Sequence, residues 1–274
     1  MDKFEELKAY ISQYDQVAIA YSGGVDSSFL MAVATDVLGK DRVLGLTLKS
    51  ALTPRKEIME AAYLAGVHGW NTELVDLDLW DQDQVVKNQP RRCYYCKKVL
   101  FTHLQSLARD RGMEVLFDGT NKDDESCYRP GMEAIKELKV LSPLRELGLS
   151  KEEIRRYSKE VYDLATWNKP AAACLASRIP YGQALTEENL RQVEEAEAFL
   201  QGLGYMTCRV RHHGNLARLE LAKEDMGAFM EKDRESVYQA LRDLGFIYVA
   251  LDLVGYRQGS GDLVLEAGNE DTLS

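Results

Sequence analysis

The chain has 274 residues, of which 45% are hydrophobic, and its formal net charge is −10. This length suits one large domain or a large domain with a smaller one, and the composition is that of a soluble globular protein. The acidic balance argues against duplex DNA or tRNA as the main partner, and no apolar run is long enough to span a membrane. The chain begins with an acidic, amphipathic stretch rather than a basic or apolar leader, so the cytoplasm is the expected location.

Between residues 14 and 120 the hydrophobic pattern alternates between short strands and helices. Helices are expected from about residue 26, at 54–64 and at 92–109, and the expected strands are Val17–Ala20, Val43–Leu48, Leu74–Leu79 and Val115–Asp118. This alternation indicates βαβ units and an α/β fold with a parallel sheet, which binds ligands at the carboxyl ends of its strands. The polar residues expected at these ends are Ser22, Lys49 and Asp118.

The segment Ser22-Gly-Gly-Val-Asp-Ser27 follows the first strand directly and has the parts of a phosphate-binding loop. Gly23 and Gly24 allow a positive φ and let the backbone approach an anion closely. The helix that begins near Asp26 directs its N–H groups and its positive dipole end at phosphate oxygens, and this carboxylate can hold Mg²⁺. Hydroxyl donors come from Ser22, Ser27 and Ser28. The segment therefore predicts a site for the pyrophosphate end of ATP.

The composition changes after a turn at residues 180–182. Before the turn, Ser150 and Glu153 match a capping box that opens a helix ending near residue 160. After it, the pattern predicts a helix at 186–200 that is capped by Thr186, followed by a hairpin of strands 205–212 and 216–221. A helix at 235–244 and a strand at 246–253 complete the predicted elements. This order indicates a small α+β domain, so the expected domains are residues 1–182 and 183–274.

Three of the five cysteines are candidates for one shared site. Cys93 and Cys96 are three residues apart near the start of a predicted helix, which places both thiols on one face, where the helix dipole favours thiolates. Cys174 lies in a distant run of small residues. Three thiolates can hold an iron–sulfur cube with one open iron, whereas zinc normally takes four ligands, or three and a water. Spacing alone leaves open a metal or cluster, buried free cysteines and a redox dithiol, and it gives no role to Cys127 or Cys208.

Several strings of the sequence, taken in order, resemble the LarE family, whose members are ATP-dependent sulfur transferases of the PP-loop ATP pyrophosphatase superfamily. These enzymes mature the nickel-pincer nucleotide cofactor of lactate racemase. The phosphate-binding loop alone would identify only the superfamily. The matching strings are Ser22-Gly-Gly-Val-Asp-Ser27, Tyr94-Tyr-Cys-Lys-Lys98, Asp118-Gly-Thr-Asn-Lys-Asp-Asp-Glu125, Tyr128-Arg-Pro-Gly131, Trp167-Asn-Lys-Pro170, Cys174, Ser177-Arg-Ile-Pro-Tyr-Gly182, Arg209-Val-Arg211 and Ala217-Arg-Leu-Glu220.

The resemblance implies a reaction in two stages. ATP adenylates a carboxylate of pyridinium-3,5-biscarboxylic acid mononucleotide and releases pyrophosphate; a sulfur nucleophile then attacks the acyl carbon, AMP leaves and a thiocarboxylate forms. In some members the cysteine matching Cys174 is a sacrificial sulfur donor. In members that also have cysteines matching Cys93 and Cys96, a 4Fe-4S cluster delivers sulfur that comes from an external sulfide source. The resemblance therefore favours the cluster form here, with ATP and Mg²⁺ as further cofactors and a homo-oligomer as the assembly.

The resemblance also implies roles for further residues. Arg209 and Arg211 alternate on one strand face, where they suit a substrate phosphate or carboxylate, although a solvated strand face is the plainer alternative. Lys97 is expected to neutralise the departing pyrophosphate. The other implied residues are Cys174 and Asp26 in catalysis, Lys49 and Gly119 at the ATP site, Asp123, Arg129 and Arg178 as substrate contacts, and Glu197 and Glu220 as metal ligands.

Two other enzyme classes and one non-enzymatic class compete with this interpretation. An ammonia-dependent ligase of the NAD synthetase type explains the loop and the length but gives the three cysteines no role. A tRNA thiolase can also use a three-cysteine cluster, but the chain is acidic and has no obvious RNA-binding module. A nucleotide-binding scaffold does not explain why Asp26 and Ser27 accompany three cysteines.

Overall fold

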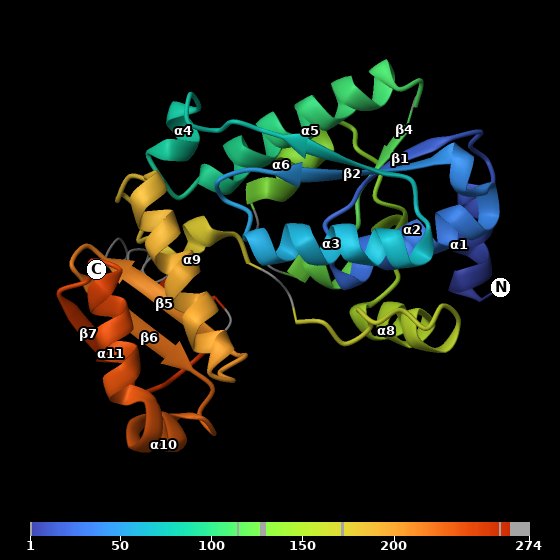
Figure 1. Ribbon diagram of the computed structural model, residues 1–274. Coiled ribbons are helices and arrows are strands. Elements are labelled where there is room, and N and C mark those ends of the chain that lie inside the picture. Colours follow the sequence, from blue (N-terminus) through green and yellow to red (C-terminus); the bar gives the residue numbers. More distant parts are fainter. Residues whose placement is uncertain (1, 114, 127–129, 171–172, 258, 264–274) are drawn as a thin grey trace, which may run out of the picture. The chain divides into compact units, whose positions relative to one another are not determined.

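The computed structural model describes residues 2–113, 115–126, 130–170, 173–257 and 259–263. The chain divides into two compact units, one formed by Met1–Leu79 with Cys93–Ala172 and the other by Trp80–Arg92 with Ala173–Ser274. Figure 1 shows the helices and strands of each unit. Of the helices in the described ranges, none is long and apolar enough to cross a membrane.

The first unit contains a four-stranded sheet in the order β3-β2-β1-β4. Its strands are β1 (Val17–Ala20), β2 (Val43–Lys49), β3 (Thr72–Asp76) and β4 (Val115–Phe117). All the pairings are parallel, and Val17 is opposite both Val43 and Val115, which places the first strand between the second and the fourth. This arrangement confirms the predicted α/β fold with a parallel sheet.

Helices cover both faces of this sheet. They are α1 (Lys3–Ile11), α2 (Val25–Leu38), α3 (Arg55–His68), α5 (Arg92–Asp110), α6 (Pro130–Glu137), α7 (Pro143–Glu146) and α8 (Lys151–Glu160), with 3-10 turns η1 (Lys40–Arg42) and η2 (Lys122–Ser126). Alternate residues of β1 belong to different cores: Val17 and Ile19 pack with α1, α2, α3 and α8, whereas Ala18 packs with α5 and α6. Figure 1 shows α5 across the strands from α2 and α3.

In the first unit, α3 and β3 end several residues away from their predicted ends. α3 continues one turn past the predicted end and stops at His68, because Gly69 takes the left-handed conformation (φ 63) that terminates a helix. β3 begins and ends earlier than the predicted strand 74–79, because Thr72–Asp76 are the residues that pair with Gly45–Lys49 of β2. Both predicted helix caps form complete capping boxes, at Ser150 and Thr186.

The second unit contains a three-stranded sheet in the order β5-β6-β7. β5 (Cys208–His213) and β6 (Leu216–Leu221) form the predicted hairpin, and β7 (Tyr248–Leu251) runs parallel to β6. The helices are α4 (Asp83–Val86), η3 (Leu175–Arg178), α9 (Glu187–Gly202), α10 (Met226–Ala228), the π-helical turn η4 (Phe229–Asp233) and α11 (Arg234–Asp243). The core of this unit packs α9 and α11 against the sheet, through side chains that include Leu200, Leu219 and Leu241.

The segment 80–92 belongs to the second unit through buried hydrogen bonds. The side-chain amide of Asn88, which is fully buried, donates at 3.2, 2.9 and 3.0 Å to the backbone carbonyls of Ile179, Pro180 and Gln183. The buried guanidinium of Arg92 donates to Asn88 Oδ1 and, at 3.0 Å, to the carbonyl of Ala176. These bonds tie residues 80–92 to residues 176–183. The second unit accordingly begins its long segment at Ala173, earlier than the boundary expected after residue 182.

Candidate active site

The loop between β1 and α2 lies at the start of a 14-residue helix. Gly24 is the N-cap of α2, and the first N–H groups of a helix have no acceptor within it. Gly23 has φ 69, a conformation that glycine adopts without strain. A Cβ atom at Gly23 would lie 2.7 Å from the Cβ of Ala61, so no side chain fits between this loop and α3. The loop backbone can therefore receive a phosphate group at the N-terminal end of α2.

Hydroxyl groups join the two ends of the loop. The N–H of Ser22 donates to Ser27 Oγ at 3.2 Å, and the two hydroxyl oxygens are 3.1 Å apart. Gly119, which follows β4, lies against the start of α2, because a Cβ there would be 3.0 Å from the Ser27 nitrogen. Of the other predicted ATP contacts, Ser28 is fully buried in the first turn, and Lys49 at the end of β2 pairs with Asp76 at 2.9 Å.

Asp26 is held by a lysine that the sequence did not single out. Lys151, the first residue of α8, places its Nζ 2.5 Å from Asp26 Oδ2, and the Asn121 side-chain amide donates to the same carboxylate at 3.3 Å. Burial raises the pKa of Asp26, and the charge of Lys151 opposes this rise. Asp123, a predicted substrate contact, accepts the backbone N–H of Lys151 at 2.7 Å. Asp123 therefore helps to fix the lysine that neutralises Asp26.

A second lysine holds the phosphate-binding loop against α3. The Nζ of Lys169 lies 3.3 Å from the carbonyl oxygen of Gly23, 2.7 Å from Glu57 and 2.8 Å from Glu60. Its side chain is only 15% exposed. Burial alone would lower the pKa of Lys169, but the two glutamates outweigh burial and raise the pKa, so the amine stays charged at neutral pH. Lys169 thus orients the Gly23 carbonyl, whose oxygen faces the charged amine of this lysine.

We expect Lys169→Met to raise the KM for ATP about tenfold, because the loss of one charged hydrogen bond frees the Gly23 carbonyl. The matched control is Lys56→Met on the same helix, whose exposed lysine lies 3.9 Å from Glu60 in an i,i+4 ion pair. That control should leave the KM unchanged. Steady-state pyrophosphate release at varied ATP measures both variants. An unchanged KM in Lys169→Met would show that the loop keeps its conformation without this contact.

The predicted cysteine ligands are distributed over both units. Cys93 and Cys96 lie in the first turns of α5, with Cys93 exposed and Cys96 partly exposed. Cys174 is exposed and directly precedes η3 in the second unit. Among the residues that the structure describes, no three His, Cys, Asp or Glu side chains gather as a metal-binding group. The three-cysteine site remains a prediction.

Cys208 differs from these three cysteines. Its side chain is fully buried between α9 and β5, and burial, followed by the charge of Glu197, raises the pKa of its thiol to about 12. A buried thiol of this kind is neither a nucleophile nor a metal ligand at neutral pH. Cys208 is therefore a core residue.

Lys97 and Arg129 were predicted to act near the nucleotide and the substrate. The side chain of Lys97 runs over Gly131 in the first turn of α6, where a Cβ would lie 2.7 Å from Lys97 Cδ. A glycine at position 131 thus leaves room for the lysine stem. Arg129 and Cys127 lie outside the described residues.

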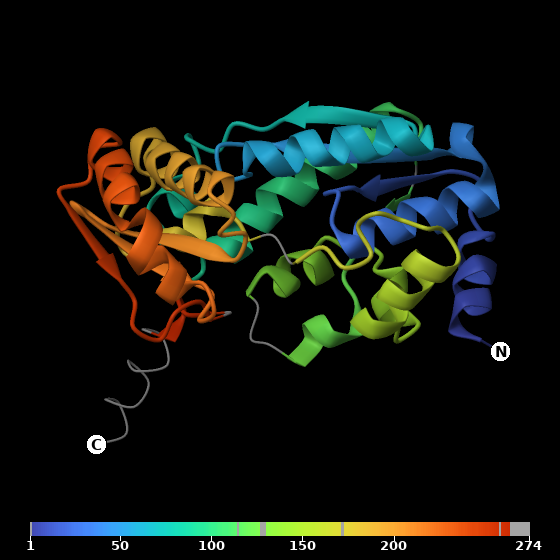
Figure 2. The same ribbon diagram turned by 60° about the horizontal axis from the view of Figure 1, so that its bottom comes forward.

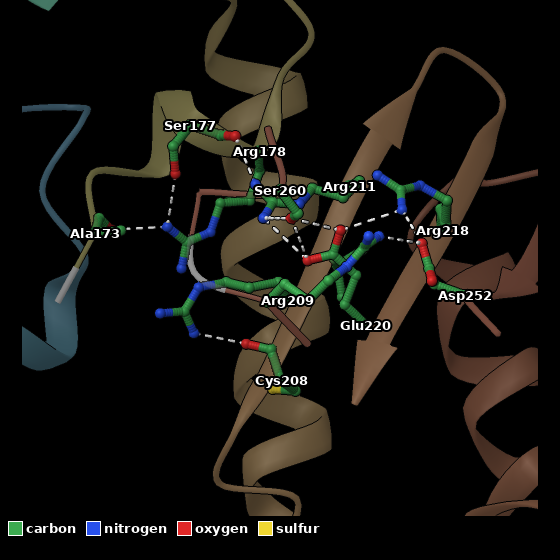
Figure 3. A network of polar contacts seen from close by, with 12 residues as sticks. Ala173, Ser177, Arg178, Cys208, Arg209, Arg211, Arg218, Glu220, Asp252 and Ser260 are labelled. Atoms are coloured by element: carbon green, nitrogen blue, oxygen red, sulfur yellow. Dashed lines mark hydrogen bonds and ion pairs between the residues drawn. The ribbon is translucent and has the colours of Figure 1, made fainter. Parts of the chain in front are cut away.

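Arg178 and Glu197 form a buried ion pair in the second unit (Figure 3 shows the arginine). Two nitrogens of Arg178 donate to the two carboxylate oxygens of Glu197 at 2.9 and 2.7 Å. The remaining nitrogen donates at 2.8 and 3.1 Å to the carbonyls of Ala173 and Cys174. Burial alone would lower the pKa of Arg178, but Glu197 outweighs it and raises that pKa. Arg178 therefore orders the backbone that carries the Cys174 thiol.

Arg211 and Glu220 form a second buried ion pair, across the β5–β6 hairpin (Figure 3). One nitrogen of Arg211 lies 2.9 Å from Glu220 and 2.6 Å from Ser260 Oγ, and another donates to the Ser177 carbonyl at 2.8 Å. Glu220 has no exposed surface and also pairs with Arg218 at 3.2 Å. The two carboxylates predicted as metal ligands, Glu197 and Glu220, are thus each paired with arginine.

Arg209 is more accessible than Arg178 or Arg211. It is partly buried, donates to the Cys208 carbonyl at 2.6 Å, and lies 5.2 Å from the ring centre of Tyr256. Neither of these two contacts is with a carboxylate. Of the four arginines predicted to bind substrate, the structure describes Arg178, Arg209 and Arg211, and among these Arg209 has the most suitable surroundings for a phosphate group.

Comparisons with known proteins show which family this chain belongs to. Over 253 residues, covering 92% of this chain and 91% of the relative, the sequence is 38% identical to pyridinium-3,5-bisthiocarboxylic acid mononucleotide synthase of Lactiplantibacillus plantarum. The chain belongs to the LarE family. It is also 41% identical, over 96% of its length and 98% of the relative, to the uncharacterized protein slr1717 of Synechocystis.

The PP-loop part of this LarE-family chain has wider relatives. The family model for NAD synthase matches residues 3–125, which include the phosphate-binding loop. The ammonia-dependent NAD synthetase of Pyrobaculum aerophilum is 38% identical over only 26% of this chain and 29% of its own. This similarity confirms the predicted PP-loop superfamily, whereas the bisthiocarboxylic acid mononucleotide synthase matches 92% of the chain.

Proposed function

We propose that this LarE-family chain is an ATP-dependent sulfur transferase that converts a carboxylate of pyridinium-3,5-biscarboxylic acid mononucleotide into a thiocarboxylate. The observation that carries the proposal is similarity to the bisthiocarboxylic acid mononucleotide synthase over 92% of the chain. A match of this length takes in the phosphate-binding loop, the exposed or partly exposed Cys93, Cys96 and Cys174, and the arginines of β5.

In the first proposed step, a substrate carboxylate oxygen attacks the α-phosphorus of ATP and pyrophosphate leaves. The N–H groups at the start of α2, with Ser22 and Ser27, would bind the phosphates, and Lys49 and Lys97 would add positive charge. Asp26 would hold Mg²⁺, which neutralises phosphate charge, once Lys151 yields the carboxylate. A carboxylate is already ionised at neutral pH, so the step needs no general base. Positioning and charge neutralisation supply the rate enhancement.

The substrate would bind through its own negative charges. Arg209 is the best-placed partner for a substrate phosphate, because within the described part of the chain it contacts a carbonyl and an aromatic ring rather than a carboxylate. Arg178 and Arg211 are proposed to order the site, since both are already paired with buried glutamates. A metal ion at Glu197 or Glu220 would have to displace these arginines.

In the second proposed step, a sulfur nucleophile attacks the acyl carbon and AMP leaves. The exposed thiols of Cys93 and Cys174 and the partly exposed thiol of Cys96 suit a 4Fe-4S cluster with one open iron, which would supply the sulfur. The alternative donor is Cys174 itself. The proposed location is the cytoplasm, where thiols stay reduced.

The testing experiment is anaerobic purification and iron reconstitution, followed by iron counts and an assay with ATP and the biscarboxylate mononucleotide. We expect about four irons per chain in the wild type and loss of iron in Cys93→Ser, Cys96→Ser and Cys174→Ser. Cys208→Ala is the control that should keep its iron. Thiocarboxylate formed without iron, with Cys174 losing its sulfur, would instead identify a sacrificial donor.

An NAD synthetase-type ligase is the second candidate, favoured by the family-model match over residues 3–125. The same assay separates the two functions, because a ligase would need ammonia and would form an amide. Amide formation from ammonia, with no sulfur product, would overturn the sulfur transferase proposal.

A further inference from the structure

The β5–β6 hairpin has one apolar face and one charged face. Val210 and Leu219 belong to the core that packs with α9 and α11. Because successive side chains of a strand alternate between its faces, the opposite face carries Arg209, Arg211, Arg218 and Glu220. A charged sheet face is normally exposed to solvent, yet Arg211 is only 7% exposed and Glu220 has no exposed surface. Another part of the second unit therefore covers this face.

The segment that follows β7 provides this cover, and its described residues from 252 to 263 are called here the strap. Figure 2 shows the strap in red, after β7. The N–H of Asp252 donates at 2.8 Å to the carbonyl of Leu219, and the N–H of Tyr256 donates at 2.7 Å to the carbonyl of Leu221. These backbone bonds fix the strap along β6.

The strap does not treat the side chains of the charged face alike. The Asp252 carboxylate pairs with Arg218, and Ser260 Oγ lies 2.6 Å from a nitrogen of Arg211 (Figure 3). Arg209 is the exception, because no carboxylate in the described part of the chain pairs with it. The strap therefore leaves the charge of Arg209 unneutralised.

Tyr256 holds Arg209 in a different way. The guanidinium carbon of Arg209 lies 5.2 Å from the centre of the Tyr256 ring, within the range of a cation–π contact. An aromatic ring attracts the cation but does not neutralise it, so the N–H groups keep their affinity for a phosphate. One Arg209 nitrogen also donates to the Cys208 carbonyl at 2.6 Å. The side chain is thus held at two points while its charge is preserved.

The position of Tyr256 depends on the glycine before it. Gly255 has φ 77, a conformation that glycine adopts without strain. A Cβ at Gly255 would lie 2.6 Å from the Leu221 carbonyl oxygen, which is the oxygen that accepts the Tyr256 N–H. Only glycine lets the strap approach β6 this closely. The backbone of the strap therefore brings the Tyr256 ring to the arginine.

We propose that Tyr256 is a positioning residue for the substrate phosphate: it holds Arg209 in the orientation that binds this phosphate. This role rests on the proposed function, since the phosphate belongs to the pyridinium mononucleotide. Tyr256 acts through Arg209 and need not touch the substrate. Loss of the ring leaves the charge in place but lets the long arginine side chain move, so binding should weaken only for ligands that carry the phosphate.

Isothermal titration of the full chain without ATP tests this role. The probes are pyridinium-3,5-biscarboxylic acid mononucleotide and the nucleoside left when its phosphate is removed. In Tyr256→Leu we expect the affinity for the mononucleotide to fall about fivefold, the size of one cation–π contact, and the affinity for the nucleoside to stay the same. Tyr256→Phe keeps the ring and should bind both probes as the wild type does.

The matched control is Tyr248→Leu on β7, where the tyrosine is 65% exposed and neither affinity should change. Thermal unfolding checks that each variant is folded, and Tyr256→Met replaces Tyr256→Leu if that variant does not fold.

A double variant tests whether Tyr256 acts through Arg209. In a chain that already has Arg209→Gln, Tyr256→Leu should cause no further loss of affinity for the mononucleotide. Wild-type affinity in Tyr256→Leu, an equal loss for the nucleoside, or a further fivefold loss in the double variant would overturn the proposal. A wild type that binds neither probe would instead overturn the proposed function. A wild type that binds both equally would overturn the phosphate contact of Arg209 and leave sulfur transfer standing.

Discussion

Cys174→Ser is expected to reduce thiocarboxylate formation to background, a loss of about 10³-fold or more, while pyrophosphate release in the first turnover continues. The exposed Cys174 thiol belongs to the second unit, whereas the loop proposed to activate the carboxylate belongs to the first. A serine hydroxyl is similar in size, but it is neither a sulfur donor nor a thiolate ligand. Quenched single-turnover assays that follow pyrophosphate and thiocarboxylate separately give the two rates.

Cys208→Ala is the control for this substitution. The Cys208 thiol is buried and has its pKa raised to about 12, so its removal should leave thiocarboxylate formation intact. The loss of one buried sulfur should lower the free energy of unfolding by about 1 kcal/mol. If Cys174→Ser lost pyrophosphate release and thiocarboxylate formation together, the assignment of the two steps to different residues would be wrong.

Most of the fold could be predicted from the sequence because its signals are local. The apolar strand Val17–Ala20, the glycines that follow it and the capping box at Ser150 each need only a few neighbouring residues. The strand predicted at 74–79 was displaced for a physical reason. Leu79 is buried without belonging to β3, so hydrophobicity extended the prediction beyond the residues that pair with β2.

The polar partners of the candidate site could not be predicted, because they are distant in the chain. Lys151 is 125 residues from Asp26, and Lys169 is 146 residues from Gly23. A lysine in a sequence is by default a solvated residue, and only the folded chain gives these two a carboxylate and a loop carbonyl.

The arginines illustrate the same limit. Alternation on β5 indicates that Arg209 and Arg211 share a strand face, but not that Arg211 meets the fully buried Glu220 of β6. Conversely, the sequence resemblance named Glu197 and Glu220 without indicating that arginines already neutralise both. Spacing therefore located the candidate residues, and tertiary contacts decide which charges are left for a ligand.

Gly23→Ala is expected to weaken ATP binding about 10- to 100-fold, because alanine meets two obstacles at this position. The backbone has φ 69, which costs an L-residue about 1–2 kcal/mol, and the added Cβ would lie 2.7 Å from the Cβ of Ala61. The loop can relieve this contact only by moving away from α3 and from Lys169. Isothermal titration with ATP and Mg²⁺ measures the affinity, and thermal unfolding shows whether the fold survives.

Gly24→Ala is the matched control in the same loop. Its backbone is extended (φ −80), and an added Cβ would meet Ser22 Oγ at an ordinary 3.4 Å, so thermal stability should not change. The double variant Gly23→Ala with Ala61→Gly separates the two obstacles, because it removes the Cβ–Cβ contact and leaves the backbone strain. We expect it to recover only part of the lost affinity, since the α-carbon of residue 61 still lies 2.8 Å from the new Cβ. Full affinity in Gly23→Ala alone would mean that the loop binds ATP in a conformation away from α3.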